Sequence, residues 1–277
     1  MAKETGKGPM TCRPRGSTSS HGLSVSETSL PGFATDMTDW GKIDVYGQFI
    51  RRDPFRNGLH YPAVLYELGD PNEMRILDVG CNEGLFPRLL AAQGASVVGY
   101  DAASARIFEA EQQEQAQRLG IQYHVATPRT FASAQTFDAA VSVMVLNYAP
   151  SFEDLAAFFV STQRYLVPDG RFISVVLNPA FSAFAENFVV RRISKLEGRA
   201  VRMEFFDEDR NAPKLAAIQH QYTKEEFERA AVLGGMRPLL WKDLFAIGAA
   251  VAEMGEDFWR PCHRAQPYAL FIAGNPR

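Results

Sequence analysis

Cysteine is scarce in this sequence. The three that occur, Cys12, Cys81 and Cys262, stand at unrelated spacings without a C-x-x-C pair. An odd number of irregularly spaced cysteines argues against a disulfide framework and favours reduced thiols in a cytoplasmic protein. No two of the five histidines have zinc-ligand spacing, and no cluster of acids suggests magnesium. We therefore expect no bound metal.

The chain also lacks a basic stripe and a long apolar run. Its formal net charge is -3 and its lysines and arginines are scattered, which argues against a nucleic-acid partner. The longest apolar runs, such as residues 139–146, are too short to span a bilayer. We expect neither nucleic acid nor membrane as a partner, while the sequence leaves open whether the chain is a monomer or a homodimer.

Residues 1–36 contain few large apolar residues and show no periodicity. This segment is rich in Ser, Thr and Gly and contains a single aromatic residue. It cannot bury enough apolar surface to offset the entropy of ordering it, so we predict that it is disordered. It has neither the Arg-rich amphipathic face of a transit peptide nor the apolar core of a signal peptide. The folded domain is expected to span residues 37–277.

From residue 74 onward, short apolar segments alternate with helical patterns. Strands are expected at 74–80, 96–101, 121–127, 137–148 and 171–178. Helices are expected between them, one of which begins at an S-x-x-D capping pattern at Ser151. Such alternation predicts an α/β fold with a doubly wound, mostly parallel sheet and helices on both faces.

Two regions interrupt this rhythm. Residues 38–70 contain two short amphipathic helical patterns around a turn-forming cluster, and residues 178–222 carry scattered aromatics without a clear α/β unit. We expect both to form an α-helical or irregular cap over one edge of the sheet. The α/β pattern then resumes with a capping box from Thr223 to Glu226 and two terminal strands at 236–245 and 268–274.

The first strand of the alternating region ends in a loop with the sequence D-V-G-C-N-E-G, from Asp78 to Gly84. The nicotinamide fingerprint G-x-G-x-x-G needs glycine at positions 80, 82 and 85, and two of these are Asn and Leu. A phosphate-binding Gly-Lys-Ser/Thr is absent as well. Glycines at 80 and 84 still allow the backbone to approach a ligand closely. A tight turn without a ligand is the alternative interpretation.

The second strand ends in Asp101. In parallel α/β sheets ligands bind at the carboxyl ends of the strands, where an acid at this position can accept hydrogen bonds from a ribose diol. Asp101 could instead cap the helix that follows it.

Four segments in succession, 76–84, 97–103, 137–148 and 166–173, resemble in order and spacing the motifs of class I S-adenosylmethionine-dependent methyltransferases. The segments "LNYAPSFEDL", "LNPAFSAFAENF" and "QYTKEEFERAAVLGGMRPLLW" are similar to the toxoflavin synthase type of small-molecule methyltransferase. The resemblance implies a Rossmann-like fold with S-adenosyl-L-methionine as cofactor. It also implies in-line methyl transfer to N or O of a small, planar metabolite.

The resemblance assigns the loop to the methionine part of the cofactor. The backbone of Gly80, Cys81 and Asn82 would approach it, with Gly84 completing the glycine pair of the loop. Asp78 would hold the loop or the cofactor's amine. The family often has glycine where this chain has Asn82, a replacement that requires a backbone conformation suited to Asn.

On the adenosine side, the resemblance assigns the ribose hydroxyls to Asp101 and places Ala102 beside the adenine. Thr127 stands where the family often has an Asp that contacts the adenine amine, so this contact would lack charge assistance. Tyr46 resembles a tyrosine that closes over the cofactor.

On the acceptor side, the resemblance places Leu146 and Asn147 near the sulfonium. Asn147, Tyr148 and Phe181 are candidate contacts of the acceptor, although Asn147 and Tyr148 could equally complete the backbone bonding of a strand end. His220 is a candidate general base, with a surface histidine on an edge strand as the alternative.

Two other functions share this fold. A nucleic-acid or protein methyltransferase should show a basic groove or a Pro motif after the strand at 137–148, whereas N-P-A-F at 178–181 follows a later strand. A non-catalytic methyltransferase-like binding module would lose the loop or Asp101, and both are present. The sequence therefore favours an enzyme.

Overall fold

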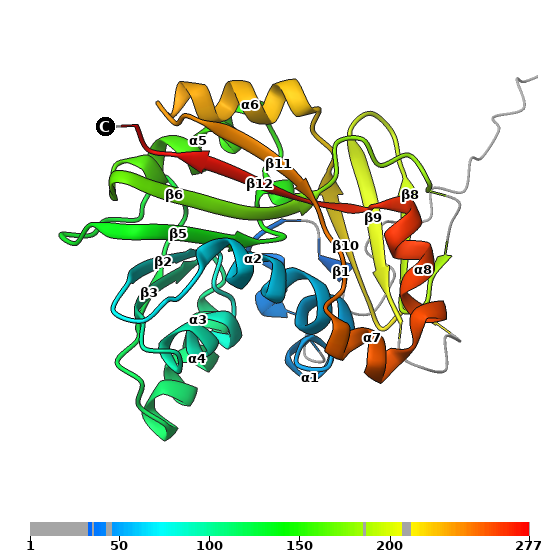
Figure 1. Ribbon diagram of the computed structural model, residues 1–277, viewed down its shortest axis with the longest axis horizontal. Helices are drawn as coiled ribbons and strands as arrows, with labels where there is room; N and C mark the ends of the chain where they lie inside the picture. The colour runs from blue at the N-terminus through cyan, green and yellow to red at the C-terminus, as the bar shows by residue number, and fades with distance from the viewer. Residues whose placement is uncertain (1–32, 35, 43–45, 185–186, 207–211, 277) are drawn as a thin grey trace, which may run out of the picture.

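The structure, a computed structural model, describes residues 33–34, 36–42, 46–184, 187–206 and 212–276. The larger of its two sheets contains seven strands, which are β2 (Arg75–Val79), β3 (Ser96–Asp101), β4 (Gln122–Val125), β5 (Phe137–Val143), β6 (Leu166–Leu177), β11 (Leu239–Asp243) and β12 (Tyr268–Gly274). Their spatial order is β11-β12-β6-β5-β2-β3-β4 (Figure 1). Strands β2 to β6 pair in parallel, whereas β12 is antiparallel to both its neighbours.

Helices cover both faces of this sheet. Successive residues of a strand point to opposite faces, so Ile76 joins one apolar core and Leu77 the other. The first core includes α2 (Tyr61–Leu68) and α3 (Leu85–Ala91), and the second includes α5 (Phe152–Gln163) and α6 (Lys224–Leu233). A further helix, α4 (Ser104–Ala116), packs beside β3 and β4. The expected Rossmann-like, doubly wound sheet is confirmed.

The capping signals of two helices are also confirmed. Ser151 Oγ accepts a hydrogen bond from the backbone N–H of Asp154 at the start of α5. Thr223 and Glu226 form a reciprocal capping box at the start of α6. Each pair satisfies backbone N–H groups that have no partner inside the helix.

The second sheet, called the cap sheet below, replaces the α-helical or irregular structure expected at 178–222. Its strands are β1 (Phe33–Ala34), β7 (Asn187–Phe188), β8 (Arg191–Lys195), β9 (Ala200–Phe205) and β10 (Leu215–His220). They lie in the order β1-β10-β9-β8-β7, antiparallel except for the pair β1–β10. The expectation was wrong because a period of two was overlooked. In β9, Val201, Met203 and Phe205 are buried, and Arg202 and Glu204 alternate with them.

The amino-terminal boundary also differs from the expected one. Residues 1–32 and 35 lie outside the described residues, so for them the disorder expected of residues 1–36 stays a prediction. Phe33–Ala34 form β1, which pairs with β10. The ordered part of the chain therefore begins before residue 37.

Short helices from residues 38–70 lie between the large sheet and the cap sheet (Figure 1). They are the 3-10 turn η1 (Asp39–Lys42), α1 (Tyr46–Ile50) and a π-helical turn, η2 (Arg56–His60), which runs directly into α2. A buried salt bridge joins Asp53, between α1 and η2, to Arg191 of the cap sheet. The Arg191 guanidinium also lies over the Phe55 ring, 4.4 Å from its centroid. These contacts fix the cap sheet against the amino-terminal helices.

Two carboxyl-terminal helices were not anticipated from the sequence. They are α7 (Gly248–Met254) and α8 (Glu256–Ala265). Phe258 and Trp259 of α8 are buried against Phe55. In α8 the buried residues are 258, 259 and 262, which span little more than one helical turn. An apolar pattern this short did not predict a helix.

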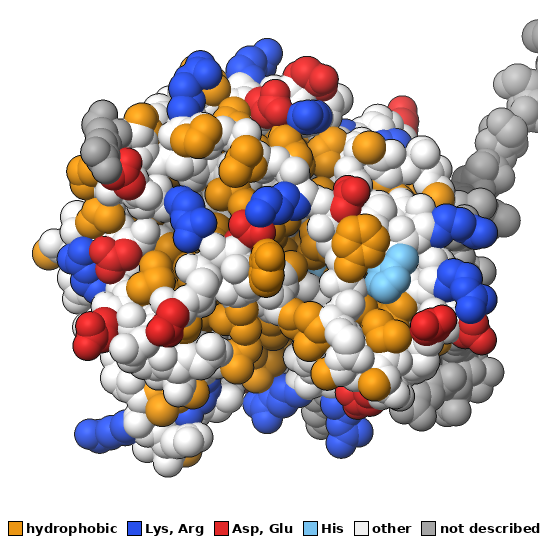
Figure 2. Space-filling model, viewed as in Figure 1, with side chains coloured by type: hydrophobic (Ala, Val, Ile, Leu, Met, Phe, Trp, Pro, Cys, Tyr) orange, Lys and Arg blue, Asp and Glu red, His pale blue; other side chains and the backbone are white. Residues whose placement is uncertain are grey.

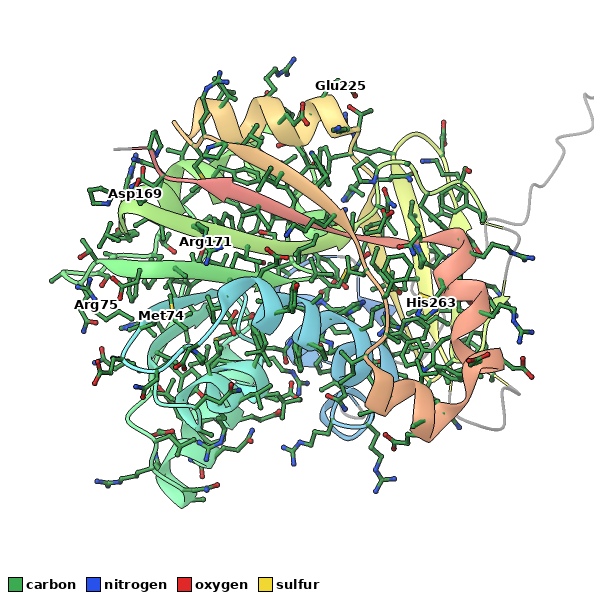
Figure 3. All side chains as sticks on the ribbon, viewed as in Figure 1. Met74, Arg75, Asp169, Arg171, Glu225 and His263 are labelled. Carbon is green, nitrogen blue, oxygen red and sulfur yellow. The ribbon has the colours of Figure 1, made fainter. Side chains whose placement is uncertain are left out.

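The surface carries mixed charge. On the face shown in Figure 2, lysines and arginines are interspersed with acids and with apolar side chains. Arg75 and Asp169 lie at the end of the large sheet away from the cap sheet, and His263 lies on α8 (Figure 3). Among the described residues, no helix combines the length and the apolar character needed to cross a bilayer.

Candidate active site

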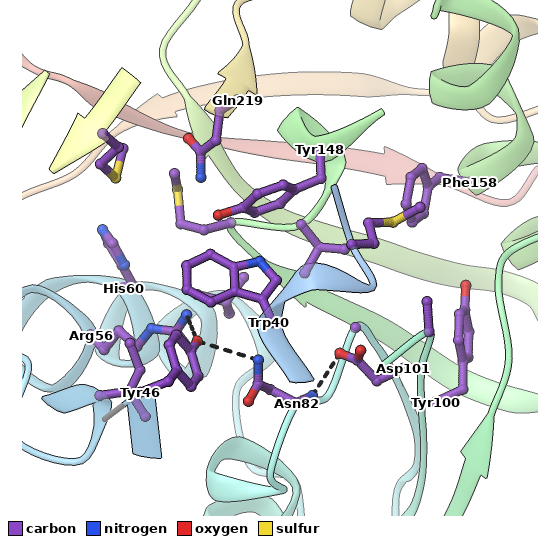
Figure 4. A pocket seen from close by; sticks show the side chains of 18 of the residues that line it. Trp40, Tyr46, Arg56, His60, Asn82, Tyr100, Asp101, Tyr148, Phe158 and Gln219 are labelled. Carbon is purple, nitrogen blue, oxygen red and sulfur yellow. Dashed lines mark hydrogen bonds between the residues drawn. The ribbon is translucent and has the colours of Figure 1, made fainter. Parts of the chain in front are cut away.

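A cavity lies where the carboxyl ends of the central parallel strands meet the cap sheet (Figure 4). Its lining comes from segments far apart in the chain, including Gly80 after β2, Asp101 at the end of β3, Met144 after β5, and Gln219 in β10. The open space measures about 60 Å³. A nucleoside-sized ligand therefore requires side chains such as Trp40, which packs between Tyr46 and Tyr148, to move.

The loop after β2 is shaped by three residues in the left-handed region. The φ angles of Gly80, Asn82 and Gly84 are 78°, 51° and 83°. Asn is among the few residues that adopt this conformation readily, so the replacement of glycine by Asn82 is tolerated. The backbone N–H groups of Gly80 and Cys81 donate to the carbonyl of Tyr100, at 2.8 and 3.0 Å. The loop is thereby held across the end of β3.

Gly80→Ala should destabilise the fold by about 2–4 kcal/mol. A Cβ at this position would lie 2.4 Å from Cγ2 of Val145, and a left-handed φ adds a cost of its own. Gly120→Ala is the matched control, because Gly120 has a φ of 83° but no atom within 4 Å of the added Cβ. It should cost only about 1–2 kcal/mol. Urea unfolding measures both, and equal losses would show that the contact with Val145 does not matter.

The Asp101 carboxylate holds the loop from the other side. Oδ2 accepts from the backbone N–H of Asn82 and Oδ1 from that of Ala103, both at 2.9 Å. Burial raises the pKa of Asp101, and these N–H groups oppose the shift. A carboxylate has about four lone-pair positions, so Asp101 can still accept from a hydroxyl group in the cavity.

Two further acids lie near this loop. Burial, reinforced by the charge of Asp101, raises the pKa of Asp78 to about 8. Burial also raises the pKa of Glu83, and the Arg56 charge opposes this. Both carboxyl oxygens of Glu83 are buried without a hydrogen-bond partner among the described residues. Buried acids with raised pKa values favour a nearby cation, because it stabilises their ionised form.

Arg56 was not singled out by the sequence. Its Nη2 donates to the Tyr46 hydroxyl at 3.0 Å, and the side-chain amide of Asn82 donates to the same oxygen at 3.3 Å (Figure 4). Nη1 donates to the Tyr61 hydroxyl at 3.4 Å. Arg56 stands in a turn-like sequence cluster close to Arg51 and Arg52, which are exposed. No local signal distinguishes it from these two.

The structure brings together only some of the predicted site residues. Six of them line the cavity, namely Tyr46, Gly80, Asn82, Asp101, Ala102 and Tyr148. Asp78, Cys81, Gly84 and Leu146 do not line it, and Asp78, Cys81 and Leu146 are buried nearby. A Cβ at Gly84 would lie 2.4 Å from the Tyr123 hydroxyl, so this glycine allows close packing behind the loop.

Asn147 and His220 do not line the cavity either. The Asn147 amide is occupied by the backbone: Nδ2 donates to the carbonyl of His220 at 2.9 Å, and Oδ1 accepts from the N–H of Leu177 at 2.8 Å. Asn147 thus ties β10 to β6. In β10 it is Gln219 that lines the cavity, so the alternation of the strand turns its neighbour His220 to the other side.

Thr127 and Phe181 also point elsewhere. The Thr127 hydroxyl lies 3.1 Å from that of Thr130, and the residues on either side, Ala126 and Pro128, line the cavity. The Phe181 ring packs 4.8 Å from that of Phe184, away from the lining. Sequence reasoning missed the lining residues His60, Arg191, Met203 and Gln219, which come from η2 and the cap sheet.

A doubly wound sheet with a glycine-containing loop after one central strand and a buried acid ending the next is the architecture of α/β domains that bind nucleoside cofactors. A family model described as a methyltransferase domain matches residues 52–231. The chain belongs to this family. Among the described residues, no group of three His, Cys, Asp or Glu could hold a metal ion.

Two sequence relatives illustrate the similarity to curated proteins. The chain is 28% identical over 172 residues to a "Ubiquinone biosynthesis O-methyltransferase" of Bartonella tribocorum, covering 58% of this chain and 67% of the relative. It is 25% identical over 151 residues to the protein of that name from Rickettsia felis, covering 54% of this chain. The chain spans 61% of the length of the Rickettsia relative.

Solved structures share the fold. A S-adenosylmethionine-dependent methyltransferase from Clostridium acetobutylicum matches with a TM-score of 0.60 at 16% identity, covering 84% of this chain and 97% of that one. CalS10 from Micromonospora echinaspora, an amino pentose methyltransferase solved with S-adenosylmethionine bound, matches with a TM-score of 0.57 at 19% identity, with coverages of 84% and 97%. By family, the chain carries a methyltransferase domain, and its fold is that of solved S-adenosylmethionine-dependent methyltransferases.

Proposed function

We propose that this chain transfers a methyl group from S-adenosylmethionine to nitrogen or oxygen of a small, planar molecule. The observation that carries the proposal is a single cavity with two unlike ends. One end joins the loop after β2 to Asp101, and the other is enclosed by aromatic side chains and the cap sheet. Once side chains such as Trp40 move, one end can take the cofactor and the other the acceptor.

The polar residues of the first end fit the cofactor. S-adenosylmethionine carries a ribose diol, a carboxylate and two cationic groups, the ammonium and the sulfonium. Asp101 has free lone pairs at the cavity, and the buried oxygens of Glu83 lack partners. Arg56 and Tyr46 supply donors that suit a carboxylate. The lining therefore offers an acceptor for the ribose diol and donors for the carboxylate, and Glu83, which lies outside the lining, adds a buried acid that favours the cationic groups.

We assign the contacts accordingly. Asp101 holds the ribose hydroxyls, with Ala102 beside the adenine. The backbone of Gly80, Cys81 and Asn82 borders the methionine part. Because such contacts are made by the backbone, a loop with few large side chains can bind the methionine part of the cofactor.

Four residues shape the site from outside the lining of the cavity, and two at the lining bind the cofactor. Asp78 and Gly84 support the loop from behind, and Leu146 fills the space beneath the strand ends. Arg56 and Tyr46 bind the carboxylate of the cofactor. Thr127, whose hydroxyl bonds Thr130, contributes to the adenine side through the backbone of its segment.

When bound, the cofactor supplies a methyl group already activated by the sulfonium charge. The chain's own task is to align the acceptor with that group and to exclude water, which can provide several kcal/mol of barrier reduction. Trp40, Tyr148 and Phe205 give the acceptor end large apolar surfaces that suit a flat molecule. We propose that residues 38–70 and the cap sheet together select the acceptor.

The resemblance to the toxoflavin synthase type supports a planar heteroaromatic acceptor. The relatives named as O-methyltransferases support an oxygen as the methylated atom. Both lie within the proposed class of small, planar acceptors. A non-catalytic binding module is the alternative, and it would bind the cofactor without turning over any such acceptor.

Calorimetric titration with S-adenosylmethionine, S-adenosylhomocysteine and NADH tests the cofactor. We expect micromolar binding of the first two and none of NADH. A screen of phenolic and heteroaromatic acceptors then measures S-adenosylhomocysteine production. Absence of binding by both sulfur compounds would refute the proposal. Binding without turnover of any acceptor in the screen would favour the binding module.

A further inference from the structure

The π-helical turn η2 places two polar residues at the cavity. Turns of this kind are rare and are frequently found at functional sites. Both its first residue, Arg56, and its last, His60, line the cavity (Figure 4). The back of the turn is fixed, because a Cβ at Gly58 would lie 2.6 Å from Cβ of Ala250. The Gly58 carbonyl also accepts from the N–H of Ile247 at 3.0 Å. The helix α7 therefore holds η2 in place.

The His60 imidazole is fully buried, and neither ring nitrogen has a hydrogen-bond partner among the described residues. Its ring stands edge-on to that of Tyr268, 4.5 Å between centroids. A buried polar group without a partner is rare in native proteins and requires an explanation. Because His60 lines the cavity, a ligand bound there can supply the missing partner.

The groups around His60 keep it neutral. Burial first, and then the positive charges of Arg191 and Arg56, lower the pKa of His60 well below its usual value. Arg191 is itself paired with the Asp53 carboxylate, and its Nη1 donates to the Tyr268 hydroxyl. A neutral imidazole offers one nitrogen that accepts and one that donates a hydrogen bond.

We propose that His60 binds the O–H or N–H group to be methylated and takes its proton, so that the acceptor is a phenol, an enol or an acidic heteroaryl N–H. This inference rests on the proposed function. During transfer, the bond from the acceptor atom to hydrogen is replaced by a bond to the methyl carbon. The carbon–sulfur bond breaks with its electron pair left on sulfur, and the proton resides on the imidazole until solvent removes it.

The acidity of the acceptor follows from the charges. An imidazole beside two arginines is a weak base, so it can deprotonate only a group that ionises readily. The same arginines favour the anionic form of an acceptor in the cavity. The Gln219 amide oxygen, buried at the lining without a partner among the described residues, offers a second contact to a donor on the acceptor.

A chromophoric acidic phenol tests this without turnover. The protein is saturated with S-adenosylhomocysteine and titrated with 4-nitrophenol, whose ionised form absorbs visible light. We expect binding with an apparent pKa of the bound phenol lowered by about one unit relative to free 4-nitrophenol. His60→Gln should lose about tenfold in affinity for the phenol and the part of this shift that His60 contributes, while the part due to the two arginines remains. His124→Gln, which changes an exposed histidine on β4, should change neither.

A second measurement does not depend on a variant that folds. In the wild-type protein, the ring nitrogens of His60 are followed by NMR while 4-nitrophenol is added. A change in the His60 signals, with those of His263 unmoved, supports the proposal. Unmoved His60 signals, or no binding of the phenol by the loaded protein, would overturn it. Failure of S-adenosylhomocysteine to bind at all would instead refute the proposed function.

Discussion

Asp101→Ala is expected to weaken S-adenosylmethionine binding by more than about tenfold. The carboxylate fixes the loop through the N–H groups of Asn82 and Ala103, and we propose that its remaining lone pairs hold the ribose diol. Hydrogen bonds to a charged acceptor are about twice as strong as neutral ones. The substitution also leaves the two backbone donors without their partner, at a cost of about 1–3 kcal/mol per donor that stays buried. Calorimetric titration measures the loss.

Two further variants sharpen this prediction. Asp101→Asn keeps an oxygen acceptor but no charge, so its affinity should lie between those of the wild type and Asp101→Ala. Asp243→Ala removes an exposed aspartate at the end of β11, remote from the cavity, and should bind as the wild type does. Wild-type affinity in Asp101→Ala would place the ribose site elsewhere.

Asp78→Asn is expected to stabilise the protein at pH 8 and to weaken cofactor binding. The folded pKa of Asp78, about 8, lies above the unfolded value of an aspartate. Between roughly pH 4 and pH 8 the folded state therefore holds a proton that the unfolded state has lost. Stability must fall as the pH rises through this window. A shift of this size corresponds to roughly 6 kcal/mol at most.

The amide removes this pH dependence because it does not ionise. Urea unfolding at pH 5.5, 7 and 8.5 should show a gain of about 2 kcal/mol or more over the wild type at the highest pH. Asp138→Asn is the control of opposite sign, because hydrogen bonds from Arg75 lower the pKa of Asp138. Asp138 stabilises the fold above its unfolded pKa and loses this effect as the pH falls. If the stability of both variants, relative to the wild type, changed with pH in the same direction, the raised pKa of Asp78 would be contradicted.

Cofactor binding by Asp78→Asn separates stability from function. At pH 8.5, above its folded pKa, Asp78 is mostly ionised and favours a cationic ligand near the loop, whereas the neutral amide does not. We therefore expect a more stable protein that binds S-adenosylmethionine less tightly. A loss of stability in exchange for function is common where a binding site contains a group that destabilises the fold.

The alternation of strands and helices was readable from the sequence because it depends on local periodicity. Strand β2, helix α3 and strand β3 lie where the pattern predicted them. The strand expected at 137–148 ends at Val143, because Met144 adopts a left-handed φ of 59° and residues 146–148 form a 3-10 turn. Nothing in the apolar run V-M-V-L announces this break.

The acceptor end of the cavity was not readable in the same way. Gln219 and His220 are neighbours in one strand, and the sequence made His220, not Gln219, a candidate catalytic residue. The pairing register of β10 with β9 decides which of them faces the cavity, since a shift by one residue exchanges the two faces. Similarly, His60 differs from the other histidines only through the π-helical turn and the packing of α7 behind it.

The sequence by itself determined the class of fold and the end of the cavity formed by the loop after β2 and Asp101, to which we assign the cofactor. That end is built within two successive β-α units, where glycines and an acid at strand ends carry a local signature. Only the tertiary structure decided the acceptor end. Its residues come from η2, β8 and β10, and their side chains meet because the cap sheet docks on the amino-terminal helices through Arg191 and Asp53. Contacts between such distant segments depend on packing in three dimensions, and no local periodicity of the sequence indicates which segments will meet.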